Sequence, residues 1–132
     1  MILLDTHALI WWLNGDDDWT SADAKAAIAA ELQDGEIAIS SITAWEIAML
    51  VARGRLSLSI DVTAWLAVAQ QIEAVRFIAV NNEIAAQAVE LPGEFHKDPA
   101  DRLIVATARK LAIPIVTADE KIRTYPHVRT IW

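Results

Sequence analysis

Met1-Ile2-Leu3-Leu4-Asp5-Thr6 is the stretch that decides the fold, because three aliphatic residues are followed at once by two polar ones. An uninterrupted apolar run of this length is typical of a strand that is covered on both faces, as in a parallel sheet. Asp5 and Thr6 end the predicted strand at residues 2–4, and a short helix is expected to follow as far as Leu13.

The rest of the chain alternates β-like runs with helical ones, which is typical of an α/β domain with a mainly parallel sheet. Further strands are predicted at residues 36–40, 77–80, 114–116 and 128–131. Further helices are predicted at residues 22–33, 42–53, 62–74, 82–91 and 99–111, with a helical turn at 121–124. We therefore expect one domain over residues 1–132, with helices on both faces of a doubly wound sheet.

Side chains that can cap helices set these boundaries. The pair Asp98-Pro99 favours a helix start, since aspartate is a good cap and proline is tolerated at the first helical position. Gly35 and Gly54 follow helical runs and are expected to end them. The other predicted N-caps are Ser21, Ser41 and Asp61.

The composition excludes several classes of protein. With 132 residues, 55% of them hydrophobic, the chain can bury a core, and disorder is not expected. No apolar run reaches the roughly 18 residues of a membrane span, and no basic region of a signal peptide precedes residues 2–4. The lack of cysteine excludes disulfides and thiolate metal sites. A cytoplasmic protein without a membrane partner is expected.

The net charge of −7 is unusual for a protein that binds nucleic acid, because phosphate contacts normally come from a basic face. The charge is uneven, however, since Lys25 is the one basic residue within residues 1–52. A basic surface is therefore possible near the C-terminal third, which holds Lys97, Arg102, Arg109, Lys110, Lys121, Arg123 and Arg129.

Two aspartates are predicted to lie just beyond strands. Asp5 follows the first strand, and Asp119 follows the fourth through Thr117-Ala118. In open parallel sheets the ligand crevice lies beyond the carboxyl ends of the strands. Asp5 and Asp119 are therefore placed where a functional site is expected, although a strand-end aspartate can also be a simple helix cap.

Three further acids belong to helices. Asp98 and Asp101 open one helix and, being three residues apart, lie on neighbouring surface of its first turn. If Asp98 is used as the cap, Asp101 is freer to bind something else. Glu46 stands in an otherwise apolar helical run, so its carboxylate must face solvent, a partner or a site.

Bringing these five carboxylates together would be costly, because like charges at short range repel and raise one another's pKa. A divalent cation removes that cost, and hard cations such as Mg²⁺ prefer oxygen ligands. The same arrangement can activate water and stabilise phosphoryl transfer. A metal-dependent reaction at phosphate follows if the acids converge in space.

Four stretches of the chain carry these residues in order: Met1–Leu9, Ser41–Ile47, His96–Ala108 with its Asp-Pro-x-Asp-Arg start, and Ile115–Asp119. Together they resemble the four motifs of PIN-domain ribonucleases, in particular the VapC-like toxins of type II toxin–antitoxin pairs. One such motif would be weak evidence, whereas four in the same order and spacing along nearly the whole chain are specific.

The resemblance implies a three-layer α/β/α fold with a mainly parallel central sheet, and an endoribonuclease that uses Mg²⁺ or Mn²⁺. It also implies the toxin of a toxin–antitoxin pair, a VapB-like antitoxin as partner, structured RNA as substrate, and a homodimer. Carried onto this sequence, the metal-binding acids are Asp5, Glu46, Asp101 and Asp119. Asp98 joins them as the extra catalytic acid of one subgroup; it binds metal directly, acts through water, or only caps its helix.

Three residues are expected to support the acids. The hydroxyl groups of Thr6 and Thr117 could orient neighbouring carboxylates, and Arg102 could hold substrate phosphate or pair with an acid. His7 and His96 flank the acids, but we interpret them as packing or hydrogen-bonding residues rather than as the catalytic base.

The six tryptophans are interpreted mainly as packing residues rather than as platforms for bases. Of the adjacent Trp11 and Trp12, one is expected in the core and the other at a dimer or antitoxin contact. Packing roles are expected for Trp45, Trp65 and Trp132. The run Asp16–Asp18 is expected to be a solvated loop rather than a metal site.

Two alternatives stay open at this stage. The first is a PIN-like binding module without catalysis, although the complete set of acids counts against it. The second is an aspartyl phosphotransferase or receiver domain, which needs a phosphoacceptor aspartate after its third strand. Residues 81–83 follow that strand here and read Asn-Asn-Glu, so a receiver is disfavoured. A dinucleotide-binding domain is disfavoured too, because no glycine-rich phosphate loop is present.

Overall fold

The computed structural model describes residues 1–16, 19 and 21–132, so part of the expected Asp16–Asp18 loop lies outside the described residues. The strands are β1 (Ile2–Leu4), β2 (Ile37–Ser40), β3 (Val75–Ile78), β4 (Ile115–Val116) and β5 (Thr130–Ile131). The helices are α1 (Thr6–Asn14), α2 (Ala22–Asp34), α3 (Ser41–Ala52), α4 (Val62–Gln71), α5 (Asn82–Val89), α6 (Pro99–Leu111) and α7 (Glu120–Arg123). Within the described residues, no helix is both long and apolar enough to cross a bilayer.

The five strands form one sheet in the order β3-β2-β1-β4-β5, and every neighbouring pair is parallel. The predicted parallel sheet is therefore confirmed. Along the sequence, β2 and β3 are added on one side of β1, and β4 and β5 are then added on its other side. The strand order therefore reverses next to β1, and in such sheets the ligand crevice lies at this switch point.

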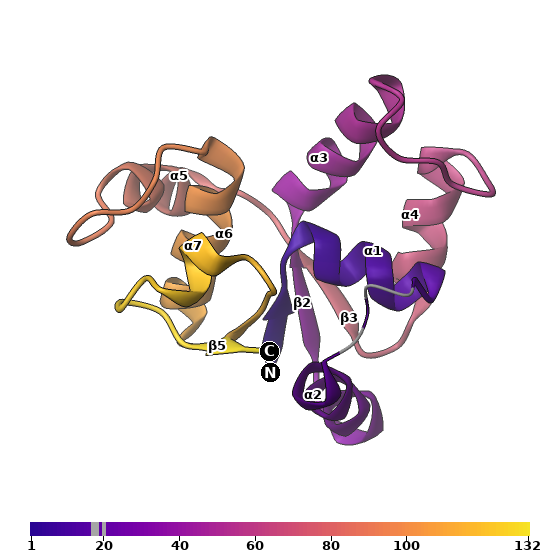
Figure 1. The fold of residues 1–132 in the computed structure, drawn as a ribbon, viewed down its shortest axis with the longest axis horizontal. Coiled ribbons are helices and arrows are strands. Elements are labelled where there is room, and N and C mark those ends of the chain that lie inside the picture. Colours follow the sequence, from indigo (N-terminus) through magenta and orange to yellow (C-terminus); the bar gives the residue numbers. More distant parts are fainter. Residues whose placement is uncertain (17–18, 20) are drawn as a thin grey trace.

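Alternate side chains of β1 face opposite layers of helices, as its uninterrupted apolar sequence predicts. Leu3 belongs to the core that also holds residues of α5, α6 and α7, whereas Ile2 and Leu4 belong to the core shared with α1 to α4. All three β1 side chains are buried. Figure 1 shows the two groups of helices on either side of the sheet, so the molecule has the expected three layers.

The helix caps mostly agree with the sequence. Ser21, Asp61 and Asp98 are N-caps as predicted, and Pro99 opens α6. The predicted cap Ser41 is wrong by one residue, because Ser40 still has extended backbone and its Oγ accepts the hydrogen bond from Ile42 N at 3.2 Å.

The third strand begins and ends two residues before its predicted position. Pairing with β2 selects Val75–Ile78, since Ile37 lies opposite Val75 and Ser40 opposite Ile78. The prediction followed the apolar run from Phe77, but β3 is an edge strand that is only partly buried, so hydrogen bonding rather than hydropathy sets its ends.

The tryptophans divide differently from expectation. Trp65 is buried as predicted, and Trp132 packs against Trp11 and Trp19 with ring centroids 5.7 and 5.6 Å apart. Trp11 and its neighbour Trp12 are both only partly buried, so the expected division between one core and one exposed residue is not found. The predicted packing role of Trp45 is wrong, because its side chain is 56% exposed.

Candidate metal centre

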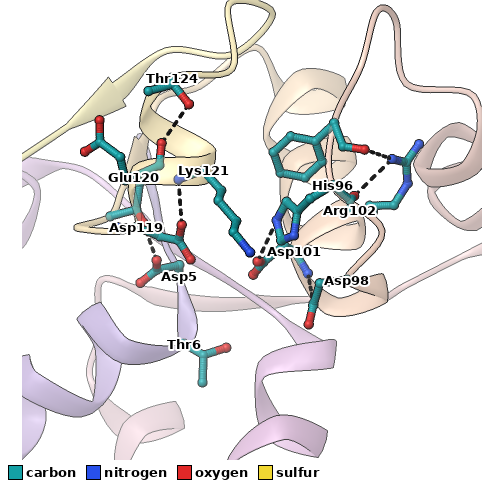
Figure 2. Close-up of polar contacts among 12 residues, drawn as sticks. Asp5, Thr6, His96, Asp98, Asp101, Arg102, Asp119, Glu120, Lys121 and Thr124 are labelled. Atoms are coloured by element: carbon teal, nitrogen blue, oxygen red, sulfur yellow. Dashed lines mark hydrogen bonds and ion pairs between the residues drawn. The ribbon is translucent and has the colours of Figure 1, made fainter.

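The five predicted acids come from four separate parts of the fold and meet at the switch point. Asp5 ends β1, Glu46 lies on α3, Asp98 and Asp101 begin α6, and Asp119 precedes α7. Figure 2 shows Asp5, Asp98, Asp101 and Asp119 around one region beyond the ends of β1 and β4. The charge of each of the other four acids raises the pKa of Asp101, so the carboxylates lie close enough to repel one another.

Asp5 is fixed through both of its carboxylate oxygens. Oδ1 accepts a hydrogen bond from Ala8 N at 2.9 Å, which caps α1, and Oδ2 accepts one from the buried Thr117 hydroxyl. Thr117 Oγ1 in turn accepts a hydrogen bond from Asp119 N at 3.0 Å. The end of β4 therefore holds Asp5 in place and positions the backbone that carries Asp119.

Glu46 is held by a short chain of hydroxyl groups. Thr6 Oγ1 donates to Glu46 Oε1 at 2.5 Å, and Thr6 Oγ1 and Thr43 Oγ1 lie 3.0 Å apart. Because the single hydroxyl hydrogen of Thr6 is used on Glu46, Thr43 must donate to Thr6. The two threonines are buried, so this chain joins α1 to α3 and fixes one oxygen of Glu46.

The first turn of α6 presents Asp101 toward the other acids. Asp98 Oδ1 accepts a hydrogen bond from Asp101 N at 2.9 Å, so Asp98 is the cap that the sequence predicts. His96 Nε2 lies 2.9 Å from Asp101 Oδ2, but the direction is not that of a hydrogen bond, and this buried nitrogen has no other partner within the described residues. When the imidazole is protonated, this contact is an ion pair between His96 and Asp101.

Three of the carboxyl groups hold their protons more tightly than usual. Burial is the largest cause for Asp5, Glu46 and Asp101, and neighbouring carboxylates add to it in each case. For Asp5 and Glu46, the hydroxyl hydrogen bonds from Thr117 and Thr6 act in the opposite direction and lower the pKa. The pKa of Asp101, which accepts no such hydroxyl hydrogen bond, rises from its ordinary 3.8 to about 7.

The donor chemistry of this cluster fits a hard divalent cation, because all five acids, including the four predicted metal ligands, offer oxygen and their mutual repulsion would be relieved by positive charge. In residues 1–16, 19 and 21–132, however, no three histidine, aspartate or glutamate side chains stand together closely enough to coordinate one ion directly. Mg²⁺ usually keeps several water ligands and binds through one or two carboxylates. The cluster therefore fits a hydrated ion that some acids contact through water.

Arg102 does not take the role expected from the sequence. Its guanidinium donates to the carbonyl oxygens of Ala88 and Val89, at the end of α5, and to those of Phe95 and His96. Four of its five N–H groups are thus used on backbone oxygens, and no described acid pairs with it. Arg102 anchors the segment 88–96 onto α6 and thereby positions His96.

Two further residues lie at the site, although neither was expected there from the sequence and Lys121 was predicted only as part of a basic surface. Thr43 lies within the second quoted motif, but nothing in its spacing indicated that it would support Thr6. Lys121 on α7 extends toward Asp101 in Figure 2, and it brings an exposed positive charge to the edge of the acidic cluster. Its nearness depends on how α7 packs, which the local sequence does not specify.

Comparisons with known proteins identify the family of the fold. The model of the PIN domain family matches residues 2–128. Ribonuclease VapC22 of Mycobacterium tuberculosis is 38% identical over 133 residues, which cover 99% of this chain and 98% of the relative.

Solved structures show the same fold. VapBC2 from Rickettsia felis, bound to a DNA fragment from its promoter, matches with a TM-score of 0.70 at 18% identity, covering 98% of this chain and 97% of the other. VapC20 of Mycobacterium tuberculosis, described as a toxin that cleaves the sarcin–ricin loop, matches with a TM-score of 0.64 at 22% identity, covering 98% and 99%. At these identities the likeness establishes the fold alone.

The raised pKa of Asp101 predicts how the stability of the metal-free protein depends on pH. The folded state binds the proton more tightly than the unfolded state, so the free energy of unfolding should fall as pH rises from about 4 to about 7. Asparagine carries no ionisable proton, so the Asp101→Asn variant should not lose stability as the pH rises. Above about pH 7 its free energy of unfolding should exceed that of wild type by at most roughly 4 kcal/mol, with little difference near pH 4.

Urea unfolding in EDTA at several pH values measures this difference. Asp61→Asn is the matched control for the amide substitution, because Asp61 is an N-cap on α4 and not one of the five acids of the cluster. A constant difference between wild type and Asp101→Asn across the pH range would contradict the burial and repulsion assigned to Asp101.

The structural role of Arg102 predicts that charge alone cannot replace it. Arg102→Gln should lower the free energy of unfolding by about 2 to 4 kcal/mol, because several charge-assisted hydrogen bonds to backbone are lost. Arg102→Lys should lose most of that stability as well, since lysine lacks the planar fork. Faster hydrogen exchange in residues 88–97 of both variants is the specific readout. Wild-type stability and exchange in the lysine variant would refute the anchor.

Proposed function

Because the chain belongs to the PIN domain family, we propose that it is a metal-dependent endoribonuclease that acts as the toxin of a toxin–antitoxin pair. The observation that carries the proposal is the convergence of Asp5, Glu46, Asp98, Asp101 and Asp119 at the switch point of the sheet. A relative that is a ribonuclease aligns over nearly the full length of both chains, which supports the same activity.

Mg²⁺ or Mn²⁺ is the proposed cofactor, held by Asp5, Glu46, Asp101 and Asp119 directly or through water. When bound, such an ion supplies positive charge that activates water and stabilises the phosphate during in-line displacement. Asp98 spends one oxygen on capping α6, and its second oxygen is available to the site.

Hydroxyl groups around the acids fix the orientation of two carboxylates and oppose the rise in pKa that burial causes. Thr117 does this for Asp5, and the chain from Thr43 through Thr6 does it for Glu46. Lys121 offers a positive charge at the edge of the cluster, where an RNA phosphate must approach a negatively charged site. This charge lowers the electrostatic barrier that a protein of net charge −7 presents to RNA.

Structured cellular RNA is the proposed substrate, and hydrolysis of a phosphodiester bond is the proposed reaction. The description of VapC20 as a toxin that cleaves the sarcin–ricin loop supports this class of substrate. Hydrolysis of a phosphodiester needs neither a redox group nor a covalent intermediate on the protein, which suits a site composed of carboxylates and hydroxyl groups.

A catalytically inactive binding module is the alternative, but the structure offers less support for it. A module that only binds would not need to keep five coupled carboxylates together, because their repulsion costs stability when no cation is present. A receiver domain is disfavoured again, since β3 lies at the sheet edge and the acids gather beyond β1 and β4 instead.

A small antitoxin protein is the proposed partner, and we propose that the toxin itself forms a homodimer. Solved structures of similar fold include toxin–antitoxin complexes, one of them from Klebsiella pneumoniae. The acidic cluster would attract an arginine or lysine side chain of an inhibitor by the same charge that attracts a cation.

The acidic cluster predicts that one aspartate can be removed without loss of the fold. Asp5→Asn keeps the cap on α1 but lowers the negative charge of the site, so RNA cleavage should fall by at least about 10- to 100-fold. Cleavage of a cellular RNA pool with Mg²⁺, Mn²⁺ or EDTA is the measurement.

Asp61→Asn is the matched control here too. Asp61 caps α4 through Ala64 N at 2.9 Å, just as Asp5 caps α1, but it is not one of the five acids of the cluster. Cleavage should require metal, survive in Asp61→Asn and fall by at least the stated factor in Asp5→Asn. Cleavage that is equal in all three proteins would point to a contaminant, and none in a folded, metal-loaded wild type would favour the binding module.

The toxin role predicts an effect in cells. Expression of the wild-type chain in bacteria should stop growth, and co-expression of the short reading frame beside its gene should restore it. Asp5→Asn should be harmless alone yet still bind that partner in a pull-down, because its fold is kept. If cells that contain the active wild-type enzyme grow normally, the toxin role is wrong, although the ribonuclease activity still holds.

A further inference from the structure

Trp45 presents a large apolar surface directly beside the acidic cluster. It lies on α3 one residue before Glu46, and 56% of its side chain is exposed. Burial of an indole is favourable, so the exposure of this side chain lowers the stability that it could contribute. An exposed aromatic side chain next to a candidate active site is a common feature of binding surfaces.

The indole lines a groove between α3 and the start of α6. The groove has a volume of about 440 Å³, within the roughly 300 to 1,000 Å³ of small-ligand sites. Glu46 and Asp98 of the acidic cluster form part of its wall. Its remaining lining is Ile42, Met49, Arg53, Pro99 and Ala100, most of it apolar. The groove is therefore an apolar extension of the acidic cluster.

Arg53 brings a positive charge to the same groove. It follows the last turn of α3 and is exposed, and in the part of the chain that the structure describes its side chain forms no ion pair. Seven residues separate it from Glu46, which corresponds to about 10 Å along the helix. Along α3 the groove thus has a carboxylate, an aromatic side chain and a guanidinium, and Asp98 adds a second carboxylate from the start of α6.

We propose that this groove binds an unpaired nucleobase of the RNA substrate, stacked on Trp45, while Arg53 contacts a neighbouring phosphate. This inference rests on the proposed ribonuclease function and extends it to a residue that positions the substrate. Stacking on aromatic side chains is how proteins hold unpaired bases, and it tolerates many sequences because every base has a π face. The site therefore selects single-stranded or looped RNA.

The charges favour a nucleotide over an apolar protein segment as occupant. A nucleotide has a flat face for the indole and a phosphate for Arg53. An apolar peptide would leave Arg53 without a partner.

Binding of a labelled RNA to a cleavage-inactive protein tests the proposal. Fluorescence anisotropy would follow a short single strand of random sequence and the corresponding duplex, both with the Asp5→Asn background. Trp45→Ala should weaken binding of the single strand by about tenfold or more and change duplex binding little. Trp45→Phe should restore most of the affinity, whereas Trp45→Leu, which is apolar but not flat, should not.

Matched variants and a second readout separate the outcomes. Val68→Ala removes an equally exposed apolar side chain on α4 and should bind both RNAs like its parent. If Trp45→Leu binds as well as wild type, or if single strand and duplex weaken equally, the stacking proposal is wrong. If Trp45→Ala changes the oligomer size in light scattering and RNA binding follows oligomer size, the groove is an interface between copies instead.

The phosphate contact of Arg53 has its own signature. For single strands, the slope of log K against log salt should become shallower by about 0.7 in Arg53→Gln, because one fewer counterion is released. An unchanged slope would show that Arg53 does not contact an RNA phosphate. Cleavage kinetics in the active background should show a raised KM for Trp45→Ala and little change in kcat. If RNA binding depends on Trp45 but the wild-type protein cleaves no RNA, the proposed ribonuclease activity is wrong and the proposed RNA-binding groove is supported.

Discussion

β1 hydrogen bonds to β2 on one side and to β4 on the other, and the acidic cluster depends on this central position. Its three residues are buried from both faces by helices, so the backbone that carries Asp5 is held firmly. The Thr117 hydroxyl then joins the end of β4 to the carboxylate of Asp5. The remaining acids are brought to this point by helices that begin where the sheet ends.

Local hydrogen bonds offset part of the cost of gathering negative charge. Asp5 and Asp98 accept backbone N–H groups at the starts of α1 and α6, where the helix dipole also favours a negative group. Helix capping and metal binding are therefore compatible roles for one aspartate, since capping uses one oxygen and leaves the second. Burial raises the pKa of Asp101 most, and the neighbouring carboxylates add to it, with no backbone or hydroxyl hydrogen bond from the described residues to oppose them.

Much of this arrangement could be predicted from the sequence, because it depends on local patterns. The apolar run before Asp5, the pair Asp98-Pro99 and the capping residues specify where strands and helices begin, and the structure confirms most of these positions. The register of β3 could not be predicted in this way, since pairing with β2 outweighs hydropathy at a sheet edge.

Roles that depend on distant packing were predicted poorly. Arg102 was expected to hold substrate phosphate or to pair with an acid, but the backbone carbonyls that it contacts belong to segments about 6 to 14 residues away. Trp45 looked like a core residue in an apolar helix, yet α3 turns that side chain outward toward the groove. Neither outcome could be read from spacing along the chain, because each depends on which helix lies next to which.

Diffraction from crystals grown with Mn²⁺ tests most directly the claim that these acids form a cation site. Anomalous scattering locates Mn²⁺ without reference to activity or to any contaminating nuclease. The account predicts a peak beyond the ends of β1 and β4, within direct or water-mediated reach of Asp5, Asp101 and Asp119. A Mn²⁺ peak found only elsewhere, or none at saturating Mn²⁺, would contradict it.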